Sequence, residues 1–283
     1  MDSSALLIPL VLLAALLHAG WNAFVRASGD RLVVLAGVNI VAMLVGAVLV
    51  PFVPLPAPAA WPYILVSVVL HCGYYFYLLK AYDRGELIQV YPLARGSAPL
   101  LISIGGMLFA GELLSPLAAA GVLLASVGII SLSFERGPPW RLGNSAVAPA
   151  LITSVWIAAY SITDGLGGRL SGNALSYICW LSLLDGWPIA LYALVLRRGA
   201  VASGLAANWR YCIAGGVFSM TAYGLVIYAM TLGAMGLVSA LRETSVIMAA
   251  MIGVFYLKER LTRVRLAAVV MVAAGVIVMQ VAS

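Results

Sequence analysis

An arginine flanked by two prolines lies inside a long apolar stretch of this sequence, in the segment Tyr91–Pro99. The surrounding apolar run, from about residue 87 to residue 109, is long enough to cross the hydrocarbon layer of a membrane, which is about 30 Å thick. Pro92 and Pro99 each lack the amide that would bond to the carbonyl four residues earlier. A guanidinium at membrane depth needs a protein partner or a watery cavity. Arg95 is therefore expected to bind a substrate carboxylate or, alternatively, to form a structural ion pair with a neighbouring helix.

A second pair of charges, Arg242 and Glu243, lies in another apolar run near the end of the sequence. Adjacent residues are about 100° apart around a helix, so these two side chains are poorly placed to pair with each other. The carboxylate of Glu243 is therefore expected to meet another helix or a cavity. Burial disfavours a charged carboxylate, so Glu243 is a candidate for proton coupling, and Asp185 is a second one. The Trp187-Pro188 pair after Asp185 indicates a local break in that helix.

Polar and aromatic residues within the apolar runs recur at helical spacing, on faces too polar for lipid. Tyrosine and tryptophan combine a flat apolar surface with one hydrogen-bonding atom, which suits a cavity for a partly polar solute. Core packing is the alternative for the aromatic residues, and a buried, hydrogen-bonded histidine is the alternative for His71. The candidate substrate-binding residues are Trp21, His71, Tyr75, Tyr82, Tyr91, Arg95, Trp156, Tyr160, Tyr223 and Arg242.

The composition indicates which elements must hold these side chains. Hydrophobic residues make up 64% of the 283 positions and charged residues 9%, and the mean hydropathy is +1.07. These values exclude an ordinary water-soluble surface and predict an all-α polytopic membrane protein, because long apolar runs are typical of helices and not of barrel strands. Ten transmembrane helices are expected, at about residues 4–25, 32–53, 62–82, 87–109, 115–134, 145–165, 174–196, 209–231, 235–257 and 264–282.

The two halves of the sequence resemble each other. Arg95 matches Arg242, and Glu112 matches Glu259 at the same offset. We therefore expect two five-helix repeats, residues 1–137 and 138–283. An odd number of spans reverses the orientation of the second repeat in the membrane. Inverted repeats of this kind are typical of transporters that bind substrate near the midplane and open to the two sides in turn.

The arginines and lysines between the apolar runs follow odd-numbered spans, except for Arg169. The positive-inside rule places the loops after odd-numbered helices in the cytoplasm and both termini outside. Because the basic residues are dispersed, the net charge of +6 reflects membrane topology and not nucleic-acid binding. The three cysteines show no metal-ligand or redox spacing and are expected to be small buried residues.

Two segments carry a resemblance to a known family. The segment His18–Phe24, followed by Gly29-Asp30-Arg31, and the segment Leu257–Thr262, leading into Gly275-Val276, resemble the drug/metabolite transporter superfamily, specifically its EamA-type members. The resemblance covers essentially the whole chain and implies ten helices in two inverted five-helix repeats. Within the superfamily, the chain is similar to exporters of amino acids and aromatic metabolites. Many relatives place their termini in the cytoplasm, whereas the charge distribution here places them outside.

These observations predict a secondary active transporter that exports small amphipathic metabolites, with amino acids including aromatic ones as the expected substrates, across the inner membrane by alternating access. Efflux of multiple drugs or of other metabolites, such as sugar phosphates, is an alternative. An intramembrane enzyme or a membrane scaffold is an alternative of another class. The sequence contains no recognisable catalytic or metal-binding motif, so no enzyme activity, cofactor or metal is expected. The expected partners are the small-molecule substrate and membrane lipid, and the protein is expected to act as a monomer.

Overall fold

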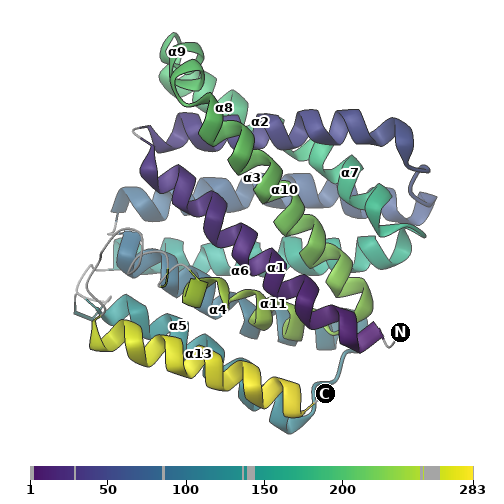
Figure 1. The fold of residues 1–283 in the computed structure, drawn as a ribbon, viewed down its shortest axis with the longest axis vertical. Coiled ribbons are helices and arrows are strands. Elements are labelled where there is room, and N and C mark those ends of the chain that lie inside the picture. Colours follow the sequence, from purple (N-terminus) through teal and green to yellow (C-terminus); the bar gives the residue numbers. More distant parts are fainter. Residues whose placement is uncertain are drawn as a thin grey trace. The chain divides into compact units, whose positions relative to one another are not determined.

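The computed structural model describes residues 3–28, 30–84, 87–135, 137–138, 144–248, 251 and 262–282. Within these residues all regular structure is helical (Figure 1). The α-helices are α1 (Ser3–Ala27), α2 (Arg31–Leu49), α3 (Trp61–Arg84), α4 (Leu87–Ala110), α5 (Pro116–Ser131), α6 (Asn144–Leu170), α7 (Ala174–Asp185), α8 (Trp187–Arg197), α9 (Ala200–Ala207), α10 (Trp209–Leu232), α11 (Met235–Arg242) and α13 (Arg263–Val281). Short 3-10 turns are η1 (Val50–Phe52), η2 (Pro58–Ala60) and η3 (Leu132–Phe134).

Nine of the expected membrane spans are confirmed in the described part of the chain. By length and composition, the segments that can cross a membrane are Leu6–Val25, Arg31–Phe52, Pro58–Ala81, Gln89–Ala110, Pro116–Phe134, Val147–Leu170, Ala174–Arg197, Trp209–Leu232 and Arg263–Val281. The tenth expected span, 235–257, is described over α11, residues 243–248 and residue 251, and its remainder, like the Leu257–Leu261 part of the family motif, lies outside the described residues. The protein is an all-α, multi-pass membrane protein.

Several helices begin at a residue whose side chain accepts hydrogen bonds from the free amides of the first turn. Asp30 Oδ1 accepts hydrogen bonds from two backbone amides of α2, at 3.1 and 3.2 Å. Ser115, Asn173 and Thr262 cap α5, α7 and α13 in the same way. These short polar side chains set the points at which the chain enters successive helices.

The seventh span is broken, as the Trp187-Pro188 pair predicts. The helix α7 ends at Asp185, and α8 begins at Trp187. Pro188 lacks the amide that would bond to the carbonyl four residues earlier. Gly186 between the two helices lies against α2, because a Cβ built on it would lie 2.7 Å from the carbonyl oxygen of Asn39. The break therefore places Asp185 at the C-terminal end of α7.

The chain forms two compact units whose segments alternate along the sequence. Unit 1 comprises Met1–Leu12, Gly73–Ile162 and Leu232–Ser283, and unit 2 comprises Leu13–Cys72 and Thr163–Thr231. Each unit therefore combines segments from both sequence halves. The division into repeats 1–137 and 138–283 and the inverted relation of the two repeats both stay predictions.

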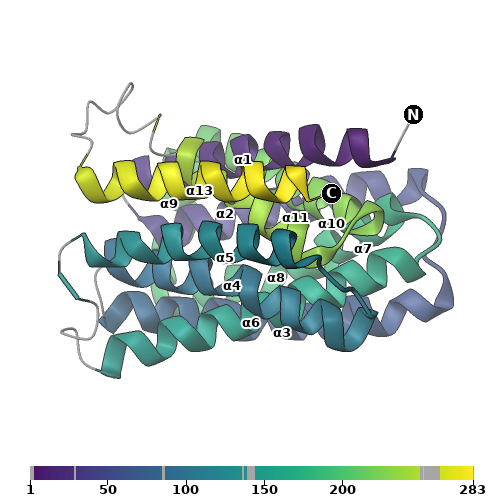
Figure 2. The same cartoon turned by 90° about the horizontal axis from the view of Figure 1, so that it is seen from below.

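In unit 1, α5 and α13 pack along each other (Figures 1 and 2). Glycines permit this approach, because a Cβ on Gly121 would lie 2.8 Å from the carbonyl oxygen of Gly275, and a Cβ on Gly275 would lie 2.7 Å from that of Gly121. The helix α4 contacts both α5 and α11. Glu112 Oε2 accepts a hydrogen bond from the backbone amide of Met235 at 2.8 Å and so caps the first turn of α11.

In unit 2, α2 packs against α7 and α8. A core of large side chains from α3, α7 and α10 includes Ile64, Tyr177 and Ile227. Tyr177 is fully buried and lies against α6, because a Cβ built on Gly167 would lie 2.7 Å from the Tyr177 hydroxyl oxygen. This packing places a phenol hydroxyl beside α6, where Asp164 lies.

Candidate functional site

Three charged side chains meet inside unit 1, and we call Arg95, Arg242 and Glu243 the arginine cluster. Arg95 lies within α4, Arg242 ends α11, and Glu243 follows it. Arg95 Nη2 donates a hydrogen bond to Glu243 Oε1 at 2.6 Å. Arg242 Nε lies 3.7 Å from the same oxygen. The exposed fractions of the three residues are 5%, 3% and 1%, so water does not screen these charges. The carboxylate of Glu243 meets another helix, as expected.

The guanidinium of Arg242 has hydrogen-bond donors without acceptors in the described part of the chain. In the part of the chain that the structure describes, its Nε and Nη2 atoms have no hydrogen-bond partner. The cluster contains two guanidiniums and one carboxylate, so it carries surplus positive charge. A buried charge without a matching counter-charge is costly, and an anion would offset that cost. Of the two arginines in the cluster, Arg242 is therefore the one with donors available for hydrogen bonds to an anionic group.

Tyrosine side chains surround the arginine cluster. Tyr74, Tyr91 and Tyr160 all lie close enough to the Arg95 guanidinium to interact with it electrostatically. Tyr74 interacts in the same way with Arg242. The rings of Tyr74 and Tyr160 meet edge to face, with their centroids 5.5 Å apart. Aromatic surfaces and hydroxyl groups thus flank the charged atoms.

A second group of aromatic rings joins α3 and α6 within unit 1. The ring of Trp156 stacks on that of Tyr77, with centroids 6.1 Å apart. Gly73 makes room for the indole, because a Cβ at this position would lie 2.5 Å from atoms of the Trp156 ring. Tyr75 contacts Tyr74 at a centroid distance of 5.1 Å. The predicted aromatic stripes of these two helices therefore pack on each other in this unit.

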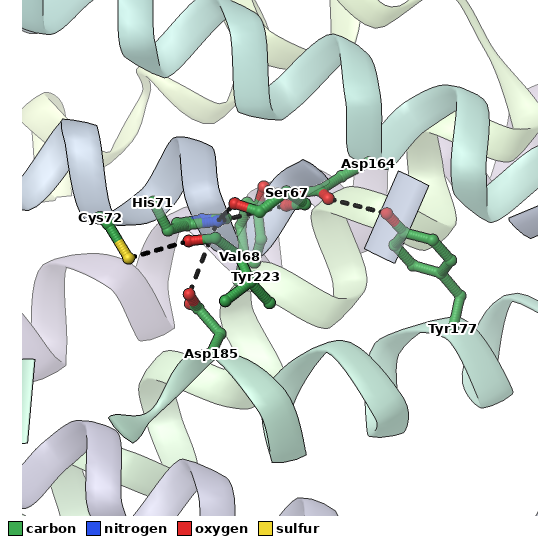
Figure 3. A network of polar contacts seen from close by, with 8 residues as sticks. All are labelled: Ser67, Val68, His71, Cys72, Asp164, Tyr177, Asp185 and Tyr223. Carbon is green, nitrogen blue, oxygen red and sulfur yellow. Dashed lines mark hydrogen bonds and ion pairs between the residues drawn. The ribbon is translucent and has the colours of Figure 1, made fainter. Parts of the chain in front are cut away.

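Unit 2 contains a separate polar group, which we call the acid network: Ser67, His71, Asp164, Tyr177, Asp185 and Tyr223 (Figure 3). Four of these residues are buried, and Asp185 and Tyr223 are partly buried. The hydroxyl of Tyr177 donates to Asp164 Oδ1 at 2.9 Å, and the hydroxyl of Tyr223 donates to Asp164 Oδ2. His71 Nδ1 lies 3.0 Å from the backbone oxygen of Ser67 and 3.8 Å from Asp185 Oδ1. Helices α3, α6, α7 and α10 each contribute to this network.

Comparison with known proteins finds a family match for the second half of this chain. Residues 145–281 match the model of the EamA-like transporter family. Over these residues, the match supports the expected resemblance to EamA-type members of the drug/metabolite transporter superfamily. No match is found among curated proteins.

The fold of this chain is shared with a solved structure. The crystal structure of another protein matches it with a TM-score of 0.81 and 19% sequence identity, over 99% of this chain and 98% of that one. At this level of identity the likeness shows the fold alone. It extends over nearly the whole chain, beyond the half that the EamA-like model covers.

The candidate site residues are distributed over both units. Unit 1 holds Tyr75, Tyr91, Arg95, Trp156, Tyr160, Arg242 and Glu243, and unit 2 holds Trp21, His71, Asp185 and Tyr223. Trp21 Nε1 donates to His18 Nδ1 at 3.3 Å on the same helix. Tyr82 belongs to α3, but its side chain lies outside the described part of the chain. The roles of these residues in substrate binding and proton coupling stay predictions.

Asp164 and Tyr177 are absent from the sequence-based candidates. The apolar run 145–165 places Asp164 at the end of a span, whereas α6 continues to Leu170 and the membrane-crossing segment ends there too. The signal that could have found Asp164 is the small-residue segment Gly165–Gly168, which extends the helix beyond the acid. Tyr177 carries no such signal, because a tyrosine near the start of a span is also typical of the membrane interface.

Proposed function

We propose that this EamA-like protein is a secondary active transporter that exports small amphipathic metabolites bearing a carboxylate, amino acids including aromatic ones, across the inner membrane by alternating access. The observation that carries the proposal is the burial of Arg242 together with its unsatisfied hydrogen-bond donors. Its guanidinium is buried, and two of its nitrogens have no hydrogen-bond partner among the described residues. Arg95 beside it is already paired with Glu243.

The two unpartnered nitrogens, Nε and Nη2, form one edge of the planar guanidinium. This edge can bind a carboxylate through two parallel N–H···O hydrogen bonds, a geometry that an ammonium group does not provide. A bound carboxylate would also balance the surplus positive charge of the arginine cluster. The free amino acids carry such a carboxylate, so they fit the charge that the cluster requires.

The aromatic residues support the amphipathic part of the proposal. Tyr74 interacts with both guanidiniums and packs on Tyr160. Tyrosine rings offer flat apolar contact beside a hydroxyl group, which suits a solute with one charged and one apolar end. Aromatic amino acids would combine a carboxylate for Arg242 with a ring for these surfaces.

Counterflow in proteoliposomes tests the proposal with a matched pair of solutes. We expect exchange of labelled phenylalanine and little exchange of phenylalaninamide, which lacks the carboxylate. Loss of charge-assisted hydrogen bonds worth about 1.5–3 kcal/mol corresponds to a decrease in apparent affinity of roughly 10- to 100-fold. Arg242→Met should therefore lose the preference for phenylalanine. Arg210→Met removes an exposed arginine and should behave as the unmodified protein does.

Two outcomes would overturn the substrate assignment. One is the absence of exchange across a broad panel of amino acids, with exchange of sugar phosphates or of cationic drugs. The other is an unchanged preference for phenylalanine over its amide in Arg242→Met. The first outcome would favour a transporter of another substrate class, and the second would move the carboxylate site away from Arg242.

Inverted repeats and external termini belong to the same proposal. The odd number of spans expected in each sequence half supports the inversion, and the basic loops after odd-numbered helices support the orientation. A single cysteine introduced at Ser283, with the three native cysteines replaced, should react with a membrane-impermeant maleimide added to intact cells. Labelling only after the membrane is opened would reverse the assigned orientation.

A further inference from the structure

The acid network of unit 2 contains more acidic than basic groups. Asp164 and Asp185 are its carboxyl groups, and His71 is the basic side chain between them (Figure 3). Asp164 is fully buried, and the exposed fractions of the His71 and Asp185 side chains are 7% and 17%. All three lie within segments that can cross a membrane. A net charge at such a depth is costly. The number of protons bound to these groups therefore changes the stability of the occluded state, in which the groups are closed off from water.

Asp164 has the surroundings of a stabilised carboxylate. Each of its oxygens accepts a hydrogen bond from a phenol, Oδ1 from Tyr177 and Oδ2 from Tyr223. The side chain of Ser67 also donates to this carboxyl group, and His71 interacts with it electrostatically. Donors fixed by the packing of α7 and α10 replace the water that a carboxylate would otherwise need. Asp164 is therefore the acid of the network that is best suited to keep a negative charge.

The geometry of His71 fixes the position of one of its protons. Its Nδ1 atom lies 3.0 Å from the backbone oxygen of Ser67, and a carbonyl oxygen can only accept a hydrogen bond. The Ser67 hydroxyl also lies 3.2 Å from Nδ1 and can either donate or accept. From the carbonyl contact we assign a hydrogen to Nδ1 in both charge states of the ring, so the proton that His71 gains or loses is the one on Nε2. The ring edge of His71 also meets the ring of Tyr223 at a centroid distance of 5.8 Å, which holds its orientation.

Asp185 differs from Asp164 in having fewer donors. Its Oδ1 atom has no hydrogen-bond partner among the described residues, and its 3.8 Å distance from His71 Nδ1 is too long for a hydrogen bond. Among the described residues, Cys72 on α3 is a further titratable group that interacts electrostatically with Asp185. The helix α2, which packs on α7, carries Arg31 at its first position and no other ionisable side chain. Asp185 is therefore the acid whose negative charge is least supported by the protein.

From this arrangement we propose that Asp164, His71 and Asp185 form a proton-binding centre, in which Asp185 exchanges the proton and Asp164 with His71 forms a fixed charge pair. In the occluded state His71 carries its Nε2 proton, Asp164 is a carboxylate and Asp185 is a neutral carboxylic acid, so the centre is neutral. When water reaches Asp185, its O–H bond breaks, the proton passes to water and the electron pair stays on the carboxylate, beside the imidazolium of His71. Reprotonation from the other side of the membrane would complete a cycle.

The structure favours a proton over other cations at this centre. Within the described residues, no group of His, Cys, Asp and Glu side chains is arranged to hold a metal ion. Each oxygen of Asp164 already accepts a hydrogen bond from a phenol hydroxyl. A proton needs no additional volume. The centre would therefore couple transport to a proton gradient.

Infrared difference spectroscopy of the substrate-free protein in lipid nanodiscs tests this proposal independently of any transported solute. A protonated carboxyl has a carbonyl stretching band that a carboxylate lacks. We expect such a band in the unmodified protein at neutral pH, and we expect it to disappear reversibly on alkaline titration. The band should be absent in Asp185→Asn and retained in Asp30→Asn, which removes an exposed acid of the same unit.

The outcomes separate the proposal from its alternatives. A band that persists in Asp185→Asn overturns the assignment of the exchanging proton to Asp185. The absence of any protonated-carboxyl band in the unmodified protein overturns the proton-binding centre itself, and this measurement requires no variant to fold. A shift of the band in Tyr223→Phe would support the connection between Asp185 and the Asp164–His71 pair, and an unchanged band there would exclude it. Because no substrate is present, failure here leaves the proposed amino-acid transport untouched.

Discussion

The guanidinium of Arg95 and the carboxylate of Glu243 lie 2.6 Å apart although 148 positions separate them in the sequence. Both side chains are almost completely buried, and Arg242 lies against the same carboxylate oxygen. One carboxylate therefore balances two guanidiniums. Because one carboxylate serves two guanidiniums, substitution of Glu243 and substitution of an arginine should lower stability by different amounts. An isolated ion pair would not show this difference.

Removing the acid should destabilise the protein more than removing either arginine. Glu243→Gln leaves two buried guanidiniums without a counter-charge, and loss of one partner of a buried pair costs about 3–5 kcal/mol. Arg95→Met leaves one charge of each sign, 3.7 Å apart, and should cost less. Thermal unfolding in detergent, compared at equal protein concentration, measures the order. Equal losses in the two variants would contradict the shared-carboxylate arrangement.

Replacing Arg242 should separate stability from function. Arg242→Met removes a charge whose Nε and Nη2 donors lack acceptors in the described chain, while the Arg95–Glu243 pair stays intact. We expect a midpoint of thermal unfolding equal to or above that of the unmodified protein, since buried donors without partners are destabilising. The shift of that midpoint caused by phenylalanine should be lost, because a ligand stabilises only the state that it binds. A marked drop in stability without ligand would indicate a structural role for Arg242.

A methyl group at the contact of α5 and α13 should weaken unit 1. A Cβ on Gly121 would lie 2.6 Å from Met279 Cγ and 2.8 Å from the carbonyl oxygen of Gly275, and the latter is backbone that cannot move aside locally. Overpacking of this kind costs about 1–3 kcal/mol, so Gly121→Ala should lower the unfolding midpoint. Gly199→Ala is the matched control, because a Cβ there meets nothing within 4 Å. Similar midpoints for the two variants would show that the α5–α13 contact adapts.

The ion pair between Asp30 and Arg197 should give a pH-dependent contribution in unit 2. Partial burial alone would raise the pKa of Asp30, but the hydrogen bonds from the Val33 amide and the Arg197 guanidinium lower this pKa below its ordinary value of 3.8. A lowered folded-state pKa adds stability above pH 3.8, and that stability is lost as the pH falls through the folded value. The two side chains are 38% and 47% exposed, so the pair itself contributes only about 0.2–1 kcal/mol.

Two variants of Asp30 separate the charge from the helix cap. Asp30→Ala should lose the cap of α2 as well, for a total of roughly 1–2 kcal/mol at neutral pH. Asp30→Asn keeps an acceptor oxygen and should lose less. For both variants, the difference in stability from the unmodified protein should decrease as the pH falls below 3.8, the ordinary pKa of Asp30. Differences that grow on acidification would contradict the assigned sign of the pKa shift.

The sequence predicts the spans well because hydropathy is a local property. Each apolar run identifies its own helix, and the Trp187-Pro188 pair identifies the break after Asp185, without knowledge of neighbouring elements. The partner of Arg95 depends on how helices dock. The repeat relates Arg95 to Arg242, but equivalence in a repeat does not specify contact. Arg242 and Glu243 are adjacent on a helix, and this excludes a good hydrogen bond between their side chains. A partner for Glu243 on another helix could therefore be anticipated, and the structure identifies it as Arg95.

The acid network could be predicted only in part for the same reason. His71 and Asp185 stand out as polar groups within apolar runs, whereas the structure adds Asp164 because α6 extends to Leu170. The two phenols that solvate Asp164 come from α7 and α10, and no spacing within either helix reveals their common target. Convergence of side chains from separate helices requires the packing itself.

The alternating arrangement of the two units also bears on the order in which the molecule is made. A chain leaves the ribosome from its N-terminus, so every segment of unit 2 has been synthesised once Thr231 emerges, while unit 1 still awaits Leu232–Ser283. During that interval α4 carries the Arg95 charge before Glu243 exists. Their ion pair therefore forms only after Glu243 has been synthesised, and until then the Arg95 guanidinium needs water or another partner.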